Sequence, residues 1–333
     1  MTVRVGVVGA GIMGADHVRI LATLVPGAQL TWVCDVNIDR ARSVAQSYGV
    51  PGATCNPMDV ISDAATDAVL IASPDETHAP LTLECLIRGK HVLCEKPLSQ
   101  KSGECLKVVA AESKRDKKLV QIGFMRRFDP AYVEMKSILD SGSIGAVVMM
   151  HNFHRNVSAP SNFTGPMAVT SSAPHDFDVA RNMLRTEFSS IMVYQPKPNG
   201  TRAAAMPIMT VMRTTTGQIV TVDVNNDAQY GYDVRAELVG DDGSIWLRSP
   251  AATELNVKRT SQSGYPADWR PRFADAYRLQ NIAWIASIQT GQPCGASSWD
   301  GFAASLAAEC GVESLVTGRE VEIKLPEMPR LYS

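Results

Sequence analysis

Short runs of apolar and β-branched residues recur through the first part of the chain, and helical stretches separate them. The runs lie at 3–8, 30–34, 68–72, 91–94 and 119–124, and the helical stretches at 40–48, 79–88 and 103–117. Continuous apolar runs of this length are typical of strands that are buried on both faces of a parallel sheet. The alternation predicts a doubly wound α/β sheet over residues 1–124.

The pattern changes after residue 124, where a helix at 130–140 precedes segments that alternate apolar and polar positions. These strand candidates are 147–154, 189–195, 208–213, 219–225, 234–239 and 244–247, followed by helices at 273–290 and 299–317 and a strand at 320–324. Thr216-Gly217 and Asp241-Asp242-Gly243 are typical hairpin turns, which join antiparallel strands. Residues 125–333 are therefore predicted to form an α+β domain whose sheet has one face free for packing.

Composition narrows the class of protein. The chain has 333 residues, 45% hydrophobic and 20% charged, which is ordinary for a soluble protein of two domains. A formal net charge of -2 gives no broad basic field, so nucleic acid or an anionic membrane is not the expected partner. The seven scattered cysteines contain no Cys-x-x-Cys pair. Such scattered, unpaired cysteines favour the cytoplasm, and so does the expected absence of a signal peptide and of a membrane span.

A glycine-rich turn, Gly9-Ala10-Gly11-Ile12-Met13-Gly14, joins the first predicted strand to a helix. In a dinucleotide-binding turn the first glycine permits the tight bend, the second lets the backbone approach a pyrophosphate, and the third lets helix and strand pack closely. The phosphates then face the helix N-terminus. The motif is weak alone, but its position between strand and helix predicts a Rossmann domain.

Asp35 ends the second predicted strand, where an acid accepts hydrogen bonds from an adenosine ribose hydroxyl. Its charge would repel a 2'-phosphate, and Arg40 is expected a helical turn or more away, so NAD is favoured over NADP. The alternative is that Asp35 only caps a helix beginning near Asn37.

Lys96 follows the predicted strand 91–94, and ligands bind outside the carboxyl ends of such strands. Its ammonium group can stabilise a substrate alkoxide, while Pro97 restrains its backbone toward extended geometry. A salt bridge to Glu95, or a bond to the cofactor ribose, explains the lysine equally well. The loop from Ser73 to His78 also follows a strand end, so Ser73, His78, Glu95 and Lys96 join the expected cofactor contacts, although helix capping explains the loop's polar residues as well.

A second polar cluster begins at Ser171. Ser172 can cap a helix with Pro174 in its first turn, which places His175 near the positive end of the helix dipole and favours a neutral, proton-accepting imidazole. Helical spacing puts Asp178 on the same face as His175. A histidine near a helix start is otherwise usually a capping or packing residue.

Together these residues resemble the glucose-fructose oxidoreductase and inositol dehydrogenase (Gfo/Idh/MocA) family, most closely its inositol 2-dehydrogenase branch. The resemblance rests on the glycine turn, Asp35, CEKP at 94–97, VQIGFMRRFD at 120–129, HRN at 154–156, HDFDVAR at 175–181, YGYD at 230–233, Trp269 and WDG at 299–301. These elements span nearly the whole chain, and their order is specific.

The resemblance implies a Rossmann domain followed by a domain with an open, mostly antiparallel sheet, which is often buried in homodimers or homotetramers. It implies reversible oxidation of a ring secondary alcohol of a cyclitol or sugar to a ketone, with NAD and without a metal. Lys96 and His175 would be catalytic. The implied substrate contacts are Arg126, His154, Asn156, Ser171, Asp178 and Tyr232.

One departure from the branch bears on the chemistry. Its members carry an aspartate where this chain has Ser171, and a carboxylate there would orient the catalytic imidazole and stabilise its protonated form. Serine brings no charge, so we expect a less basic His175 and slower alcohol oxidation, or another substrate.

Two other functions stay open from the sequence. An NAD-dependent glycosidase or dehydratase uses transient oxidation on the same fold, and a non-catalytic NAD-binding regulator is possible because fold does not determine function. Retention of Lys96 and His175 argues against the regulator.

Overall fold

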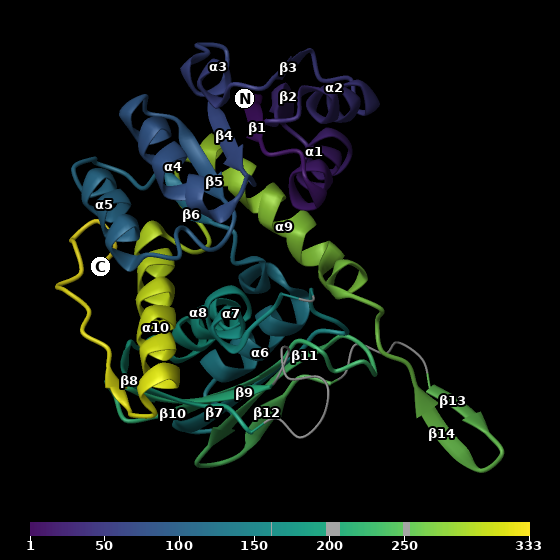
Figure 1. The fold of residues 1–333 in the computed structure, drawn as a ribbon, viewed down its shortest axis with the longest axis vertical. Coiled ribbons are helices and arrows are strands. Elements are labelled where there is room, and N and C mark those ends of the chain that lie inside the picture. The colour runs from purple at the N-terminus through teal and green to yellow at the C-terminus, as the bar shows by residue number, and fades with distance from the viewer. Residues whose placement is uncertain (161, 198–206, 249–253) are drawn as a thin grey trace. The chain divides into compact units, whose positions relative to one another are not determined.

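The computed structural model describes residues 1–160, 162–197, 207–248 and 254–333. Contacts divide the chain into two compact units (Figure 1). The first comprises Met1–Phe128, Ala276–Ser305 and Leu325–Ser333, and the second comprises Asp129–Asp275 and Leu306–Lys324. Each unit is described separately.

The first unit contains a six-stranded parallel sheet in the order β3-β2-β1-β4-β5-β6. Its strands are β1 Val3–Val8, β2 Ala28–Cys34, β3 Gly52–Thr54, β4 Ala68–Ile71, β5 His91–Cys94 and β6 Val120–Ile122. The order reverses between β1 and β4, which is the switch point where open α/β sheets bind ligands. The predicted doubly wound sheet is confirmed, and only the three-residue β3 was missing from the prediction.

Helices connect these strands. They are α1 Ile12–Leu24, α2 Ile38–Ser47, α3 Pro57–Ser62, α4 His78–Ile87 and α5 Ser102–Glu112, with 3-10 turns at Asp75–Thr77 and Met125–Phe128. The turn preceding α2 shows why the helix begins there, because the Asn37 side chain accepts bonds from the N–H groups of Asp39 and Arg40, each at 3.1 Å. Asn37 is thus the N-cap residue of α2, a role that the sequence also allowed for Asp35.

The second unit is built on a seven-stranded sheet in the order β12-β11-β7-β10-β9-β8-β15. Its strands are β7 Val147–Arg155, β8 Phe188–Tyr194, β9 Ile208–Thr214, β10 Ile219–Asn225, β11 Asp233–Gly240, β12 Ser244–Trp246 and β15 Val321–Glu322. Strands β7 and β10 are parallel, and the other five pairs are antiparallel. Both predicted hairpin turns are confirmed, with Gly217 at φ +97°.

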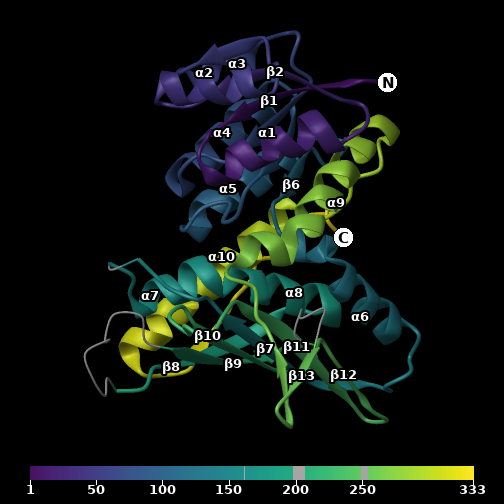
Figure 2. The same cartoon turned by 90° about the vertical axis from the view of Figure 1, so that its right-hand side faces the viewer.

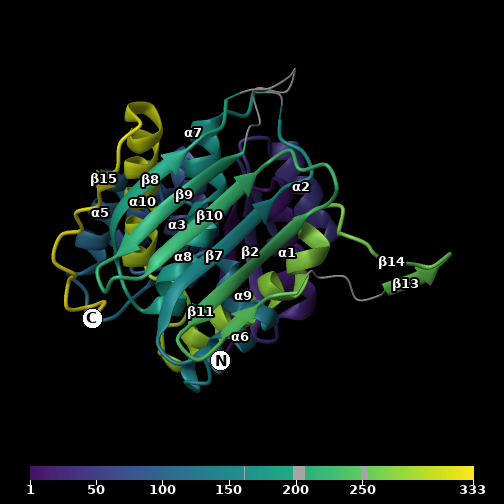
Figure 3. The ribbon, with the colours of Figure 1, turned by 90° about the horizontal axis from the view of Figure 1, so that it is seen from below.

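Helices cover one face of this second sheet (Figure 2). They are α6 Pro130–Asp140, α7 Gly165–Met167 and α8 Pro174–Leu184, with a π-helical turn at Ala168–Ser172 between the last two. Along β7, Met150, Asn152 and His154 are buried, while their neighbours are half-buried or exposed. Figure 3 looks onto the opposite face, where no helix of the described second unit lies over the strands.

A two-stranded hairpin, β13 Glu254–Val257 with β14 Thr260–Ser263, projects away from this sheet (Figures 1 and 3). Every residue of both strands is exposed. The alternation in β13 covers only four residues and β14 is entirely polar, which is why the sequence pattern did not reveal the hairpin.

The contact-based units divide the C-terminal residues differently from the predicted second domain, 125–333. Helices α9 Trp269–Thr290 and α10 Ser298–Thr317 both cross between the units, so residues 276–305 and 325–333 group with the first. The physical reason is a set of long-range bonds: Ser305 donates to the Ser99 carbonyl at 2.8 Å and Ser298 to the Glu112 carboxylate at 2.6 Å. No helix in the described residues is long and apolar enough to cross a membrane.

Candidate active site

The glycine turn after β1 has the geometry that a bound pyrophosphate requires. Gly9 has φ +97°, and an added Cβ would lie 2.4 Å from the Ala72 carbonyl oxygen. A Cβ on Gly14 would lie 1.8 Å from the Gly9 carbonyl oxygen, whereas one on Gly11 would meet nothing within 4 Å. The first and third glycines thus permit close packing, and the second leaves open space in which a phosphate fits.

Helix α1 begins beside that space. Its N-cap residue is Gly11, so no side chain caps the first N–H groups, and Ile12 and Met13 form the first turn. The uncapped N–H groups and the helix dipole favour an anion. These residues therefore fit the phosphates of a dinucleotide.

Asp35 is held beside the same turn. Its Oδ2 accepts from the Ala10 N–H and its Oδ1 from the Asn37 N–H, both at 2.9 Å. Arg40 Nη1 also donates to both oxygens over longer distances, 3.4 Å to Oδ1 and 3.5 Å to Oδ2, so a ribose hydroxyl would take the place of these long bonds. The expectation that Arg40 lies well away is wrong: its Nη1 is 3.4 Å from Asp35 Oδ1, because the side chain folds back along the first turn of α2.

His78 joins two loops at the carboxyl edge of the sheet. Its Nδ1 is 2.7 Å from the Pro97 carbonyl oxygen and its Nε2 is 2.7 Å from the Ser73 carbonyl oxygen. Carbonyl oxygens only accept, so both ring nitrogens donate and the imidazole is protonated. Burial alone would lower the pKa of His78, but the Cys94 sulfur and the two carbonyls raise it to about 10. The predicted contact of Ser73 and His78 with a cofactor stays a prediction.

Glu95 is fixed by a histidine to which the sequence gave no role. His17 Nε2 lies 3.0 Å from Glu95 Oε1, and the Asn281 amide donates to His17 Nδ1 at 3.0 Å. That donor places the ring proton on Nε2, so His17 donates to the carboxylate. Glu95 Oε2 in turn accepts from the Lys96 backbone N–H at 3.2 Å. His17 therefore helps to position the start of the Lys96 loop.

Lys96 lies at the end of β5, half-buried, and its peptide bond to Pro97 is cis. Burial lowers its pKa, the nearby Arg126 lowers it further, and Glu95 and Asp75 act in the opposite direction. A lysine whose pKa is depressed exchanges a proton more easily near neutral pH. Arg126, only 1% exposed, follows the neighbouring strand β6, so the structure brings these two predicted residues together.

In the second unit, His154 and His175 lie side by side with ring centroids 6.5 Å apart. His154 Nδ1 is 2.7 Å from Oδ2 of Asp176, whose side chain is fully buried. Asp176 was missing from the predicted site, because its contact joins a helix to a strand and leaves no periodic signal. The pair places a carboxylate next to an imidazole, although on a different histidine from the expected one.

The predicted cap of the His175 helix is wrong. Ala173, not Ser172, precedes α8, and its φ of -59° and ψ of -27° are helical. The Ala173 N–H donates to the Ala168 carbonyl at 3.1 Å, so the π-helical turn runs directly into α8. His175 is therefore not at a free helix start, and the dipole argument for a neutral imidazole is not supported.

Ser172 instead joins a polar cluster with Asn156 and Asn226. Asn226 Oδ1 accepts from Ser172 Oγ at 3.0 Å and from the Asn156 amide. Asn226 is 3% exposed, and its amide nitrogen has no hydrogen-bond partner among the described atoms. Since a buried donor without a partner is costly, this amide is suited to a ligand oxygen. Asn226 follows β10 without any recognisable motif, so the sequence did not identify it.

The remaining predicted substrate residues also belong to the second unit. Asp178 is fully buried, Tyr232 is 3% exposed and Ser171 is half-buried. The Tyr232 ring packs edge-on against Phe273, with centroids 6.1 Å apart. No group of metal-ligating side chains is found in the described ranges.

Comparison with known proteins decides the family. Residues 3–124 match the family described as oxidoreductase family, NAD-binding Rossmann fold, and residues 132–246 match the GFO/IDH/MocA C-terminal domain. Inositol 2-dehydrogenase 1 of Saccharopolyspora erythraea is 46% identical over all of this chain and 99% of its own length. The chain belongs to the Gfo/Idh/MocA oxidoreductase family. The predicted Rossmann domain, its NAD cofactor and the open antiparallel sheet agree with this family.

Other Gfo/Idh/MocA relatives are similar along their full length. Inositol 2-dehydrogenase of Klebsiella pneumoniae strain 342 is 37% identical, with 100% of this chain and 99% of the relative covered. The crystal structure of myo-inositol dehydrogenase from Lactobacillus casei, in complex with NAD(H) and myo-inositol, superposes with a TM-score of 0.95 at 29% identity, covering both chains completely.

Proposed function

We propose that this protein is an NAD-dependent dehydrogenase that oxidises a ring secondary alcohol of a cyclitol to a ketone, reversibly. The observation that carries the proposal is the similarity, over the whole of both chains, to a myo-inositol dehydrogenase whose structure contains NAD(H) and myo-inositol. The similarity to several curated inositol 2-dehydrogenases supports the same substrate class.

The first unit supplies the cofactor contacts. Gly9, Gly11 and Gly14 shape the pyrophosphate turn, and Asp35 accepts from the adenosine ribose. When NAD is bound, its nicotinamide accepts the hydride of the alcohol carbon. Lys96 stabilises the alkoxide oxygen, and its lowered pKa also suits it to pass on a proton.

The second unit supplies proton transfer and recognition of the ring. His175 takes part in transfer of the hydroxyl proton, and Asp178, Tyr232 and Asn156 bind the other hydroxyls, as the family resemblance implies. Buried groups that bind hydroxyls discriminate strongly among isomers, because a missing partner leaves them unsatisfied. Ser171 removes a charge from this part of the site, so the preferred cyclitol is expected to differ from that of relatives with aspartate there.

We further propose that the protein assembles into homodimers or homotetramers through the uncovered face of the second sheet. On this face the Arg235 guanidinium lies 4.5 Å above the Phe153 ring, and Arg155 pairs with Asp223. Trp246 is 61% exposed on the edge strand β12. Aromatic residues and arginines are enriched in protein–protein interfaces relative to the rest of the surface. Light scattering tests this, and a monomer at micromolar concentration would contradict it.

A cytoplasmic location is proposed as well. All seven cysteines are free thiols, and Cys34, Cys85, Cys94 and Cys105 are buried. Unpaired cysteines persist in reducing compartments. Fractionation of the native cell, with the protein in the cytosolic fraction, is the expected result.

A panel of cyclitols, aldoses and amino sugars, assayed with NAD by absorbance at the NADH band, tests the activity. Release of NADH with one cyclitol and formation of the matching ketone are expected. Substrate turnover without net NADH would favour the glycosidase or dehydratase. NAD binding without turnover across the panel would favour the regulator.

A further inference from the structure

The His154–Asp176 pair has the chemistry of an oriented proton acceptor. We propose that His154, held by Asp176, is a second proton-transferring residue of the reaction, and that this pair replaces the aspartate–histidine pairing that Ser171 removes. The inference rests on the proposed dehydrogenase function. It assigns His154 a catalytic role in addition to contact with the substrate ring, and it makes Asp176 its positioning residue.

The hydrogen bond settles which nitrogen of His154 is basic. Asp176 Oδ2 accepts at 2.7 Å from Nδ1, so the ring proton is on Nδ1 and the Nε2 lone pair is the proton acceptor. Asp176 is fully buried and His154 is 4% exposed. A buried carboxylate in this position fixes the tautomer and stabilises the imidazolium that forms after proton transfer.

Asp176 is the charged group that a 2.7 Å hydrogen bond joins to His154. Its neighbours across the sheet are Val224 on β10 and Val234 on β11, neither of which carries a charge. The helix that packs on β7 is α8. Its titratable and charged side chains are His175, Asp176, Asp178 and Arg181, and Arg181 is bound to Glu187.

The spacing of the two histidines allows one hydroxyl to serve both. The ring centroids are 6.5 Å apart, so both imidazoles can lie beside one bound hydroxyl. His175 lacks both the carboxylate at position 171 and the helix start that the sequence suggested. The ring of His154 is held by the buried carboxylate of Asp176.

The chemical step balances within the proposed reaction. The O–H bond of the alcohol breaks and its proton forms an N–H bond at His154 Nε2. With NAD held by the first unit, the nicotinamide would take the hydride of the alcohol carbon, and the carbon–oxygen bond would become a carbonyl. The new imidazolium carries one positive charge opposite the Asp176 carboxylate, and it then releases the proton through His175 to water.

Asp176→Asn is the direct test, because the amide keeps the shape and removes the charge. A carboxylate favours the protonated imidazole, so its loss lowers the pKa of His154. We expect kcat for oxidation to fall about 10- to 100-fold, which is the scale of general acid–base assistance. The acid limb of the kcat profile should move down by about one pH unit, with a smaller change in KM.

Two further variants separate proton transfer from structural support. Asp140→Asn removes an exposed carboxylate at the end of α6, and it should leave kcat and its pH profile unchanged. Ser171→Asp added to Asp176→Asn should restore at least part of kcat, because it returns a carboxylate to His175. An Asp176→Asn profile with an unchanged acid limb and a change in KM alone would overturn the proposal.

Nitrogen-15 NMR of the histidines gives a readout that does not depend on turnover. In the wild-type protein the His154 signal, identified by its loss in His154→Gln, should show a protonated Nδ1 and a pKa above 6.5. A proton on Nε2, or a pKa below 6.5, would overturn the proposal even if Asp176→Asn does not fold. If no polyol yields NADH while His154 titrates as expected, the proposed function fails and the pair itself stands.

Discussion

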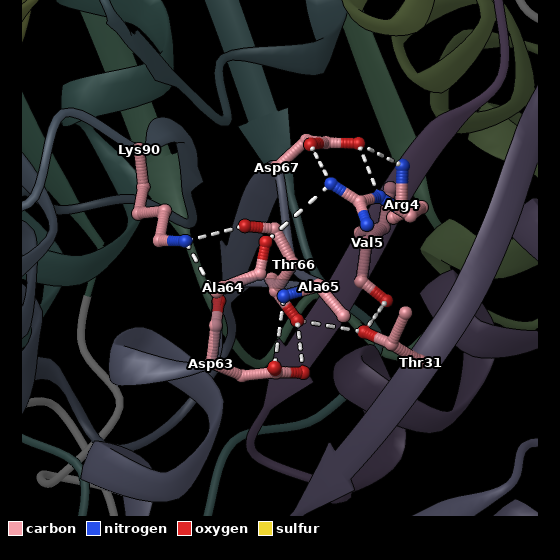
Figure 4. Close-up of polar contacts among 9 residues, drawn as sticks. All are labelled: Arg4, Val5, Thr31, Asp63, Ala64, Ala65, Thr66, Asp67 and Lys90. Atoms are coloured by element: carbon pink, nitrogen blue, oxygen red, sulfur yellow. Dashed lines mark hydrogen bonds and ion pairs between the residues drawn. The ribbon is translucent and has the colours of Figure 1, made fainter.

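Similar charged residues lie at the amino ends and at the carboxyl ends of the strands of the six-stranded sheet, but their arrangements are opposite. These two sides of the sheet are called the amino edge and the carboxyl edge. At the amino edge, Arg4 donates to Asp67 at 2.6 and 3.0 Å, and Lys90 donates to the Asp63 carbonyl at 2.8 Å (Figure 4). Each charge there is matched by a near neighbour. At the carboxyl edge, Lys96 is held where burial and Arg126 disfavour its charge.

The directions of the pKa shifts express this difference. The Ala65 N–H lowers the pKa of Asp63, and Arg4 lowers the pKa of Asp67, so both ionised forms are stabilised. Lys96 shifts away from its ionised form. The charged side chains at the amino edge therefore stabilise the fold. At the carboxyl edge, Lys96 is held where its charge is disfavoured, which is typical of catalytic groups.

Substitution of one lysine at each edge should give the largest difference between the two edges in activity and stability. Lys96→Met is expected to lower kcat/KM about 1000-fold, because an alkoxide loses its cationic partner, while the melting temperature changes little. Lys90→Met should lower the melting temperature and keep kcat/KM within about twofold. NADH formation and thermal unfolding measure both, and equal losses of activity would remove the distinction.

A substitution in the glycine turn should have the next largest effect. Gly11→Ala places a Cβ in the open space where the phosphate fits, so the affinity for NAD is expected to fall about 10- to 100-fold with little change in stability. Gly103→Ala is the matched control, since its Cβ would also meet nothing within 4 Å. Titration calorimetry with NAD measures both. An unchanged NAD affinity in Gly11→Ala would contradict the assignment of the turn.

His78 links stability at the carboxyl edge to pH. Its pKa is raised to about 10, so its contribution is fully present below the ordinary histidine pKa and is lost as pH rises through 10. His78→Gln should reduce the free energy of unfolding by about 2 kcal/mol at pH 6, and the difference should shrink toward pH 10. Urea unfolding at several pH values measures this, and a constant difference would argue for a neutral imidazole.

Asp67→Asn at the amino edge should have the smallest effect. The pKa of Asp67 is lowered, so its stabilisation is present above the unfolded pKa and is lost as pH falls through the folded one. The variant should lose about 1 kcal/mol of stability at pH 7, with kcat unchanged, since the carboxylate is partly exposed. The loss should disappear in strong acid, and a loss that persists there would point to packing rather than charge.

The sequence predicted the elements of both sheets well, because burial on one or both faces leaves a periodic signal. It also predicted that Lys96, Asp35 and the glycine turn follow strand ends, and the structure has them there. The partners of these residues were not predictable in this way. His17 reaches Glu95, and Asp176 reaches His154, through contacts between distant segments that no local pattern encodes.

Errors in the prediction have similar causes. Ser172 has the composition of a helix cap, but tertiary packing extends the helical turn before it and directs its hydroxyl to Asn226. The helix at 269–290 is recognisable by length, whereas its division between two units depends on bonds such as Asn281 to His17. Local sequence patterns locate a helix or strand, whereas its tertiary contacts decide which unit and which site it belongs to.

We propose that the carboxyl edge of the first sheet serves an NAD-dependent cyclitol oxidation. The most direct measurement is NADH absorbance after mixing NAD and a panel of inositol isomers with the wild-type, Lys96→Met and Lys90→Met proteins. We expect NADH from at least one isomer with the wild type and Lys90→Met, and about 1000-fold less with Lys96→Met. No NADH from any isomer with the wild type, or equal rates with Lys96→Met, would contradict it.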